Sequence, residues 1–145
     1  MTRSNLPRSN AKAVVAPTAG QAMVGVLQRM GDVLGPGAIY SLVHHGAFQE
    51  GLALGAQGRP ADAEQAVQTV ADLLGLEARL ESSRDRRLRV VVQPAPQLSL
   101  ESRGAAALVV GLLEGLLTAA RGSQVLVAGE PHLGPAGELD IELSG

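Results

Sequence analysis

The feature that most constrains this chain is an almost unbroken apolar run between Gly104 and Arg121, which predicts a single helix. Glu114 is the one charge inside the run. A helix that is apolar on nearly all sides must be covered, either by its own domain or by a partner chain. The rest of the sequence is therefore expected to supply the elements that cover residues 104–121.

Three helices are predicted before this run, at residues 18–34, 36–56 and 62–74. Thr18 and Asp62 are each followed three residues later by a Gln, a spacing that caps helix N-termini. Gly35 and Gly75 are typical helix stops. The first helix has the spacing of an amphipathic helix, and its apolar residues share one face: Ala22, Met23, Val26, Leu27, Met30 and Leu34.

Glycines inside predicted helices carry a further signal, because each costs helix stability. The second helix contains Gly46, Gly51 and Gly55, and the apolar helix contains Gly111 and Gly115, four residues apart on one face. Glycine allows another backbone to approach closely. We expect these two helices to be sites of close packing.

Alternating patterns predict two hairpins, at residues 77–93 and 124–143, with Gly134 to Gly137 in the second reversal. The predicted fold is α+β: three helices, a β-hairpin, the apolar helix and a second β-hairpin. The four strands form an antiparallel sheet with helices packed on one face. Residues 1–16 are predicted to be a flexible tail, and residues 17–145 a single domain.

Composition excludes several classes of function. A net charge of −2 and 1% aromatic residues argue against a general nucleic-acid binder. The apolar run is interrupted too early for a membrane span, and the polar start carries no export signal, so we expect a cytoplasmic protein. There is no cysteine, phosphate loop or Gly-x-Ser-x-Gly motif, so we expect no enzymatic activity and no cofactor.

Gly-Leu-Leu-Glu-Gly-Leu-Leu at 111–117, the strand Val125-Leu126-Val127, Glu130 and a glycine-containing hairpin resemble the 4-vinyl reductase domain. That domain shares its fold with small subunits of the TRAPP vesicle-tethering complex. The resemblance covers residues 18–143 in element order and 107–143 in motif. It implies a homodimer formed through helices, which either binds a small hydrophobic molecule or acts as a protein-interaction subunit.

Many domains of this type carry a zinc site, and the resemblance places its ligands at Ala107, Glu130, Leu133 and Ile141. Three of these residues are aliphatic, and one carboxylate cannot supply the four ligands that zinc requires. We therefore expect no metal here. Aliphatic packing of Leu133 and Ile141 is expected to replace it as a staple.

The resemblance also suggests which residues would bind a ligand and which would form the dimer interface. The candidate ligand pocket comprises Tyr40, His44, Phe48, Leu112 and Glu114. The candidate dimer interface comprises Ile39, Val43, Leu108, Gly111 and Gly115.

Each polar candidate also has an ordinary structural interpretation. His44, His45 and His132 would form a metal site only if the fold brought them together, and ordinary histidines are preferred. Glu114 is either a buried functional carboxylate or, as we favour, the mark of an exposed stripe. The arginines between residues 79 and 89 could bind an anionic or acidic partner, face solvent, or pair with the acidic residues of the last strand, Glu138, Asp140 and Glu142.

The leading hypothesis is a non-enzymatic, dimeric interaction or regulatory module of the 4-vinyl reductase and TRAPP-subunit type. It would bury residues 104–121, with part of the second helix, between protomers. It could also bind a heterologous protein. The alternative is a sensor domain that binds a small apolar ligand in an aliphatic pocket between the second and fourth helices. The two hypotheses differ in what fills the interior: a ligand binder needs a cavity of roughly 300 Å³ or more, whereas a scaffold packs its interior closed.

Overall fold

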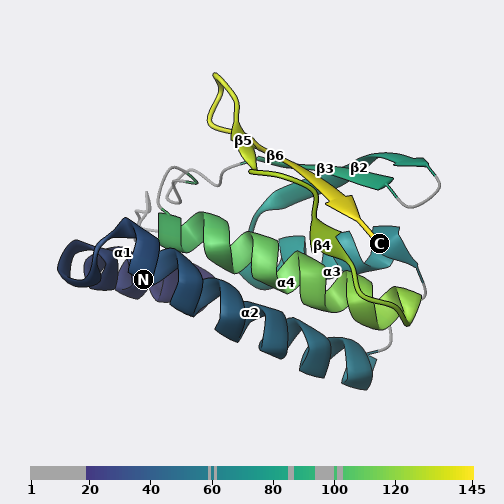
Figure 1. Cartoon of the computed structure of the whole chain (residues 1–145), viewed down its shortest axis with the longest axis horizontal. Helices are drawn as coiled ribbons and strands as arrows, with labels where there is room; N and C mark the ends of the chain where they lie inside the picture. The colour runs from purple at the N-terminus through teal and green to yellow at the C-terminus, as the bar shows by residue number, and fades with distance from the viewer. Residues whose placement is uncertain (1–18, 59, 61, 85–86, 94–99, 101–102) are drawn as a thin grey trace, which may run out of the picture.

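The computed structural model describes residues 19–58, 60, 62–84, 87–93, 100 and 103–145. Over these residues the chain forms four helices and an open antiparallel sheet of five strands (Figure 1). The predicted α+β class is therefore confirmed. The predicted tail, residues 1–16, and the Thr18 cap lie outside the described residues.

The helices are α1 (Ala19–Leu34), α2 (Pro36–Gly58), α3 (Ala63–Leu74) and α4 (Arg103–Arg121). The strands are β2 (Glu77–Arg84), β3 (Arg87–Gln93), β4 (Leu126–Val127), β5 (His132–Leu133) and β6 (Leu139–Ser144).

Helix α3 shows how directly capping residues set the boundaries. The side chain of Asp62 accepts a hydrogen bond of 2.9 Å from the backbone N–H of Gln65, which satisfies one of the free donors at the helix start. At the other end Gly75 has φ of +66°, a left-handed conformation that favours glycine. Both predicted ends of this helix are confirmed.

Helix α4 is the core of the molecule and lies between α2 and the sheet (Figure 1). Its residues from Gly104 to Leu117 are almost all buried, within an aliphatic cluster that α3, β3 and β6 complete. Among the described helices, α4 alone is long and apolar enough to cross a membrane, but it is mostly buried in the domain, as a core helix would be. The cover required by its sequence comes from its own chain.

Glycines bring α2 and α4 into backbone contact. A Cβ placed on Gly111 would lie 2.7 Å from the carbonyl oxygen of His44, and one on Gly51 would lie 2.8 Å from that of Leu112. The predicted close approach is thus confirmed for Gly51, Gly55, Gly111 and Gly115. It is wrong for Gly46, because a Cβ there would have nothing within 4 Å.

The sheet differs from the prediction in its number of strands and in their order. Strand β6 is central: β3 pairs along one side of it, while β4 and β5 pair with different stretches of the other side. The second hairpin therefore joins β5 to β6, and the predicted strand 124–128 contributes only the two residues of β4. Within the described ranges the sheet has five strands rather than the predicted four, because two-residue strands are too short to show an alternating pattern.

The outer face of the sheet carries ion pairs between β3 and β6. Arg89 contacts Asp140 at 2.5 Å, and Arg87 contacts Glu142 at 3.6 Å. Arg79 is bonded to Glu81 within β2. Of the three interpretations of the arginine-rich stretch, internal pairing is confirmed for Arg87 and Arg89, whereas Arg86 lies outside the described residues.

Candidate functional site

Glu114 is the only charged residue that is buried among the described residues, with 1% of its surface exposed. The Nε2 atom of His44 lies 2.5 Å from its Oε1 atom. Its other oxygen accepts a hydrogen bond of 2.7 Å from the backbone N–H of Val127. One carboxylate therefore connects α2, α4 and β4.

The prediction that Glu114 marks an exposed stripe of α4 is wrong. His44 is 70 residues away in sequence and reaches Glu114 only because the glycine contacts hold α2 against α4. Burying a carboxylate is costly unless hydrogen bonds replace its water, and here each oxygen has a partner. One turn later, Thr118 accepts a bond of 2.9 Å from the N–H of Val125, so α4 holds the segment leading into β4 at two points.

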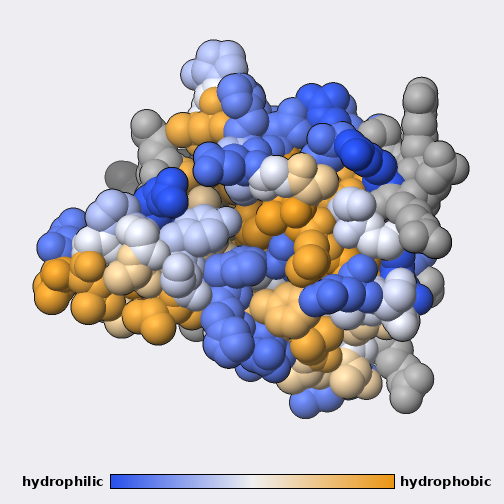
Figure 2. All heavy atoms as spheres, viewed as in Figure 1, coloured by the Kyte–Doolittle hydropathy of each residue, from blue (hydrophilic) through white to orange (hydrophobic). Residues whose placement is uncertain are grey.

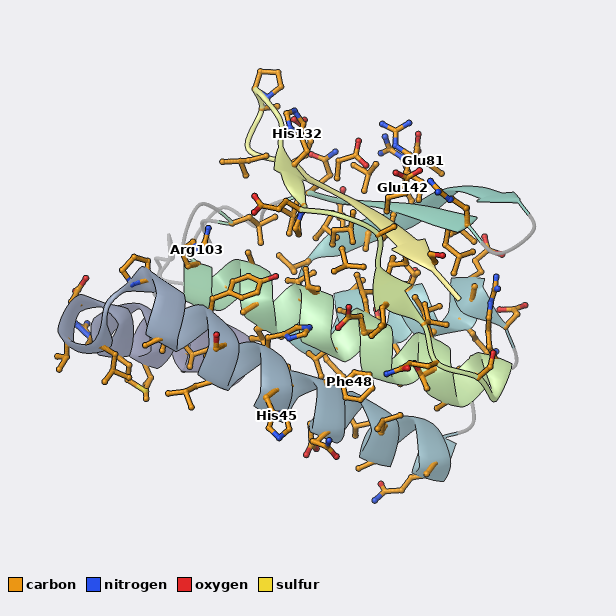
Figure 3. The ribbon with its side chains drawn as sticks, viewed as in Figure 1. His45, Phe48, Glu81, Arg103, His132 and Glu142 are labelled. Carbon is orange, nitrogen blue, oxygen red and sulfur yellow. The ribbon has the colours of Figure 1, made fainter. Side chains whose placement is uncertain are left out.

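An aromatic and cationic row extends from this buried pair. The rings of Tyr40 and His44, one helical turn apart on α2, stack with centroids 5.8 Å apart. The guanidinium of Arg103, at the start of α4, lies 5.1 Å from the centre of the Tyr40 ring. Figure 3 shows Arg103 at this end of α4, with His45 on the outer side of α2 and His132 on the far hairpin.

Burial raises the pKa of the Tyr40 hydroxyl above its usual 10.0, and the charge of Glu114 raises it further. Arg103 acts in the opposite direction, while Glu130 adds a smaller upward effect. A raised pKa means that the fold favours the neutral hydroxyl. The stability that Tyr40 contributes is then present below the pKa of an unfolded tyrosine and is lost as pH rises through the folded pKa.

This pKa can be measured directly, because Tyr40 is the only tyrosine and there is no tryptophan. Titration followed by the ultraviolet absorbance of tyrosinate should give a midpoint above 10.0 in the folded chain. Glu114→Gln should lower that midpoint and Arg103→Ala should raise it, provided that circular dichroism shows the fold intact. A midpoint at or below that of the urea-unfolded chain would contradict this description of the site.

A hollow of about 350 Å³ lies beside Tyr40. Its polar wall is formed by Tyr40, Arg103 and Glu130, and its apolar wall includes Val127 and Leu139. His44 and Glu114 are not among its lining residues.

A larger and almost wholly aliphatic trough of about 560 Å³ lies among the four helices. The residues that line it are Leu27, Met30, Ile39, Leu42, Val43, Gly46, Ala47, Glu50, Leu54, Leu73, Leu74, Leu108 and Leu112. Glu50 is the only charged residue among them.

The structure divides the predicted ligand pocket. Tyr40, His44 and Glu114 come together in the row described above. Leu112 instead lines the trough, and Phe48 lines neither cavity; it lies on α2 near α4 (Figure 3). The two aromatic residues thus do not wall a pocket between α2 and α4, because both lie outside the trough.

Most of the predicted dimer interface lies inside one chain. Ile39 and Leu108 are buried, and Gly111 and Gly115 contact α2 of the same chain. The expectation that residues 104–121 are buried between protomers is corrected accordingly, because α2, α3 and the sheet already cover α4. Only Val43, which is half-buried in the trough, keeps part of its surface open.

The four positions that correspond to the zinc ligands differ in their exposure to solvent. Ala107 and Ile141 are fully buried, Glu130 is exposed, and Leu133 has 39% of its surface exposed. The proposed staple is therefore wrong for Leu133, whereas Ile141 belongs to the core. Within the described residues, no group of three or more His, Asp or Glu side chains is placed to hold a metal.

Sequence reasoning missed one feature of the surface. The amphipathic spacing of α1 would ordinarily indicate a buried face, yet Val26, Met30 and Leu34 are exposed, as is Val33 beside them. The signal was present, because a helix with a regular apolar stripe needs something to cover it. Nothing in the sequence shows that the single chain leaves the stripe uncovered.

Comparison with known proteins adds no relative: no family model, no curated protein and no solved structure matches this chain. The resemblance to the 4-vinyl reductase domain and TRAPP subunits remains a prediction from the residues that carry it.

Proposed function

We propose that this chain is a non-enzymatic interaction module of the 4-vinyl reductase and TRAPP-subunit type, and that it works as a homodimer. Its working surface is an apolar face formed by α1, α2 and α3. We define this face by its exposed large residues: Val26, Met30, Val33 and Leu34 of α1, Leu42 of α2 and Leu73 of α3.

The observation that carries the proposal is the uncovered stripe of α1. Val33 has 84% of its surface exposed and Val26 has 57%. Apolar side chains gather over this end of the molecule, at the lower left of Figure 2. Single exposed apolar residues are ordinary, but a contiguous group marks an interaction site.

The shape of the face favours a protein over a small molecule. Met30, Leu42 and Leu73 line the trough, but Val26, Val33 and Leu34 are not among its lining residues. A ligand seated in the trough would leave that part of α1 in water. A second protein surface can cover both, and a second copy offers the same apolar chemistry in a self-complementary interface.

The arrangement of the polar residues is consistent with a non-catalytic role. The chain has no cysteine nucleophile, and the two oxygens of Glu114 are engaged by His44 and by the backbone of Val127. These bonds hold helices and sheet together.

A second candidate function is the binding of an aliphatic small molecule. The trough, at about 560 Å³, lies within the range of ligand sites, and its walls come from α2 and α4 as the sensor hypothesis requires. Its lining contains no aromatic residue, so the expected ligand is an aliphatic chain rather than an aromatic ring.

Mass spectrometry of the full chain, first native and then denatured, separates the two. A native mass of twice 14.9 kDa with no additional mass supports the homodimer. A monomer carrying a small mass that disappears on denaturation supports the ligand binder and contradicts the dimer. A bare monomer at every concentration contradicts the proposed dimer.

A further inference from the structure

Gly46 is the exception among the interior glycines of α2. Gly51 and Gly55 are pressed against α4, but the space over Gly46 is open and forms part of the trough wall. A glycine in an exposed helix interior lowers helix stability relative to alanine. In the single chain no close contact explains this cost, and a helix backbone docked over Gly46 would.

The exposed stripe of α1 has the form of a docking helix. Val26, Met30 and Val33 recur at spacings of four and three residues, the pattern by which a helix presents anchors to a groove. The stripe is about 10 Å long at the rise of an α-helix. The trough follows α2 from Ile39 to Leu54, about 22 Å, so it is longer than the stripe.

Two oppositely charged residues also favour contact between the stripe and the trough. Arg29 lies on α1 between Val26 and Met30, and Glu50 lies on the wall of the trough one turn beyond Gly46. Both residues are exposed, and neither makes an ion pair within the described part of the chain. They are opposite charges placed on the two surfaces that would meet.

We propose that two copies associate by placing the α1 stripe of each in the trough of the other, across Gly46, with Arg29 facing Glu50 of the partner subunit. The arrangement is isologous, so the contact forms twice. This inference rests on the proposed homodimer and specifies which surfaces form it.

The first test enlarges Gly46. Gly46→Leu fills the space that the partner's helix would occupy, and a Cβ at this position meets nothing in the single chain. We expect a monomeric native mass with the helical circular dichroism of the wild type. The matched control is Gly37→Leu, at another exposed glycine of α2 with open space around it but outside the trough. It should remain dimeric.

The second test reverses the charges. Arg29→Glu and Glu50→Arg should each weaken the dimer by roughly tenfold or more in Kd, because like charges then face each other across the interface. The double variant should recover most of the affinity. Sedimentation equilibrium at several concentrations measures all four chains.

The outcomes separate this arrangement from the proposed function. A wild-type dimer that is unaffected by Gly46→Leu, or by either charge reversal, overturns the arrangement and leaves the homodimer standing. Single reversals that weaken the dimer with no recovery in the double variant overturn the Arg29–Glu50 pairing. A wild-type chain that is monomeric throughout overturns the arrangement together with the homodimer.

Discussion

Gly115→Ala is expected to lower the free energy of unfolding by about 3 kcal/mol, the upper end of the usual range for an overpacked contact. A Cβ on Gly115 would lie 2.7 Å from the backbone nitrogen of Leu52 and 2.8 Å from the Cα of Gly51. The neighbouring atoms belong to the α2 backbone, which cannot move aside as a flexible side chain does. The two helices would have to separate along most of their contact.

Urea unfolding followed by circular dichroism measures this effect. The matched control is Gly37→Ala, which adds the same methyl group to α2 where nothing lies within 4 Å, and it should change stability by less than about 0.5 kcal/mol. If Gly115→Ala and Gly37→Ala had the same urea midpoint of unfolding, the backbones of α2 and α4 would not be in contact.

Glu114→Ala is expected to lower the free energy of unfolding by about 3–5 kcal/mol. This is the range for breaking a buried ion pair by removing one partner. The change leaves the Nε2 atom of His44 and the N–H of Val127 without their acceptors, and it opens a cavity in α4. The loss should appear first at β4, which has only two residues and depends on α4 for anchorage. Hydrogen exchange at the Val127 amide should therefore accelerate more than exchange in β3.

Glu114→Gln is the control for this prediction. The amide keeps the size of the carboxylate and an oxygen that can accept from Val127, so it should recover a large part of the stability. If the alanine variant were as stable as the wild type, Glu114 would not be a structural connection between α2, α4 and β4.

Local signals in the sequence predicted much of the helical layer. Asp62 and Gly75 lie at the two ends of α3, as predicted. The apolar run 104–121 forms the buried helix α4. Capping and helical periodicity depend on residues a few positions apart, which a sequence displays directly. Gly51 and Gly55 of α2 and Gly111 and Gly115 of α4 were informative as well, because a side chain at any of these positions would clash with the facing helix.

Long-range relations were not accessible in the same way. The pairing of β3 with β6 joins residues about fifty positions apart, and the contact of His44 with Glu114 joins residues 70 apart. No periodicity encodes such pairings, so Glu114 was misjudged as exposed. The α1 stripe presents the opposite case, because its pattern predicted an apolar face correctly while the fold left that face open.

The central claim is that a second copy covers the α1 stripe in solution, and Val33→Asp tests it most directly. Val33 has 84% of its surface exposed in the single chain, so an aspartate there should leave the monomer fold unchanged. In a dimer buried at this face it would bring two unpaired carboxylates into an apolar contact. By sedimentation equilibrium, we expect a wild-type mass of twice 14.9 kDa and a variant mass of 14.9 kDa, with equal circular dichroism. A wild-type monomer, or a variant that remains fully dimeric, would contradict the claim.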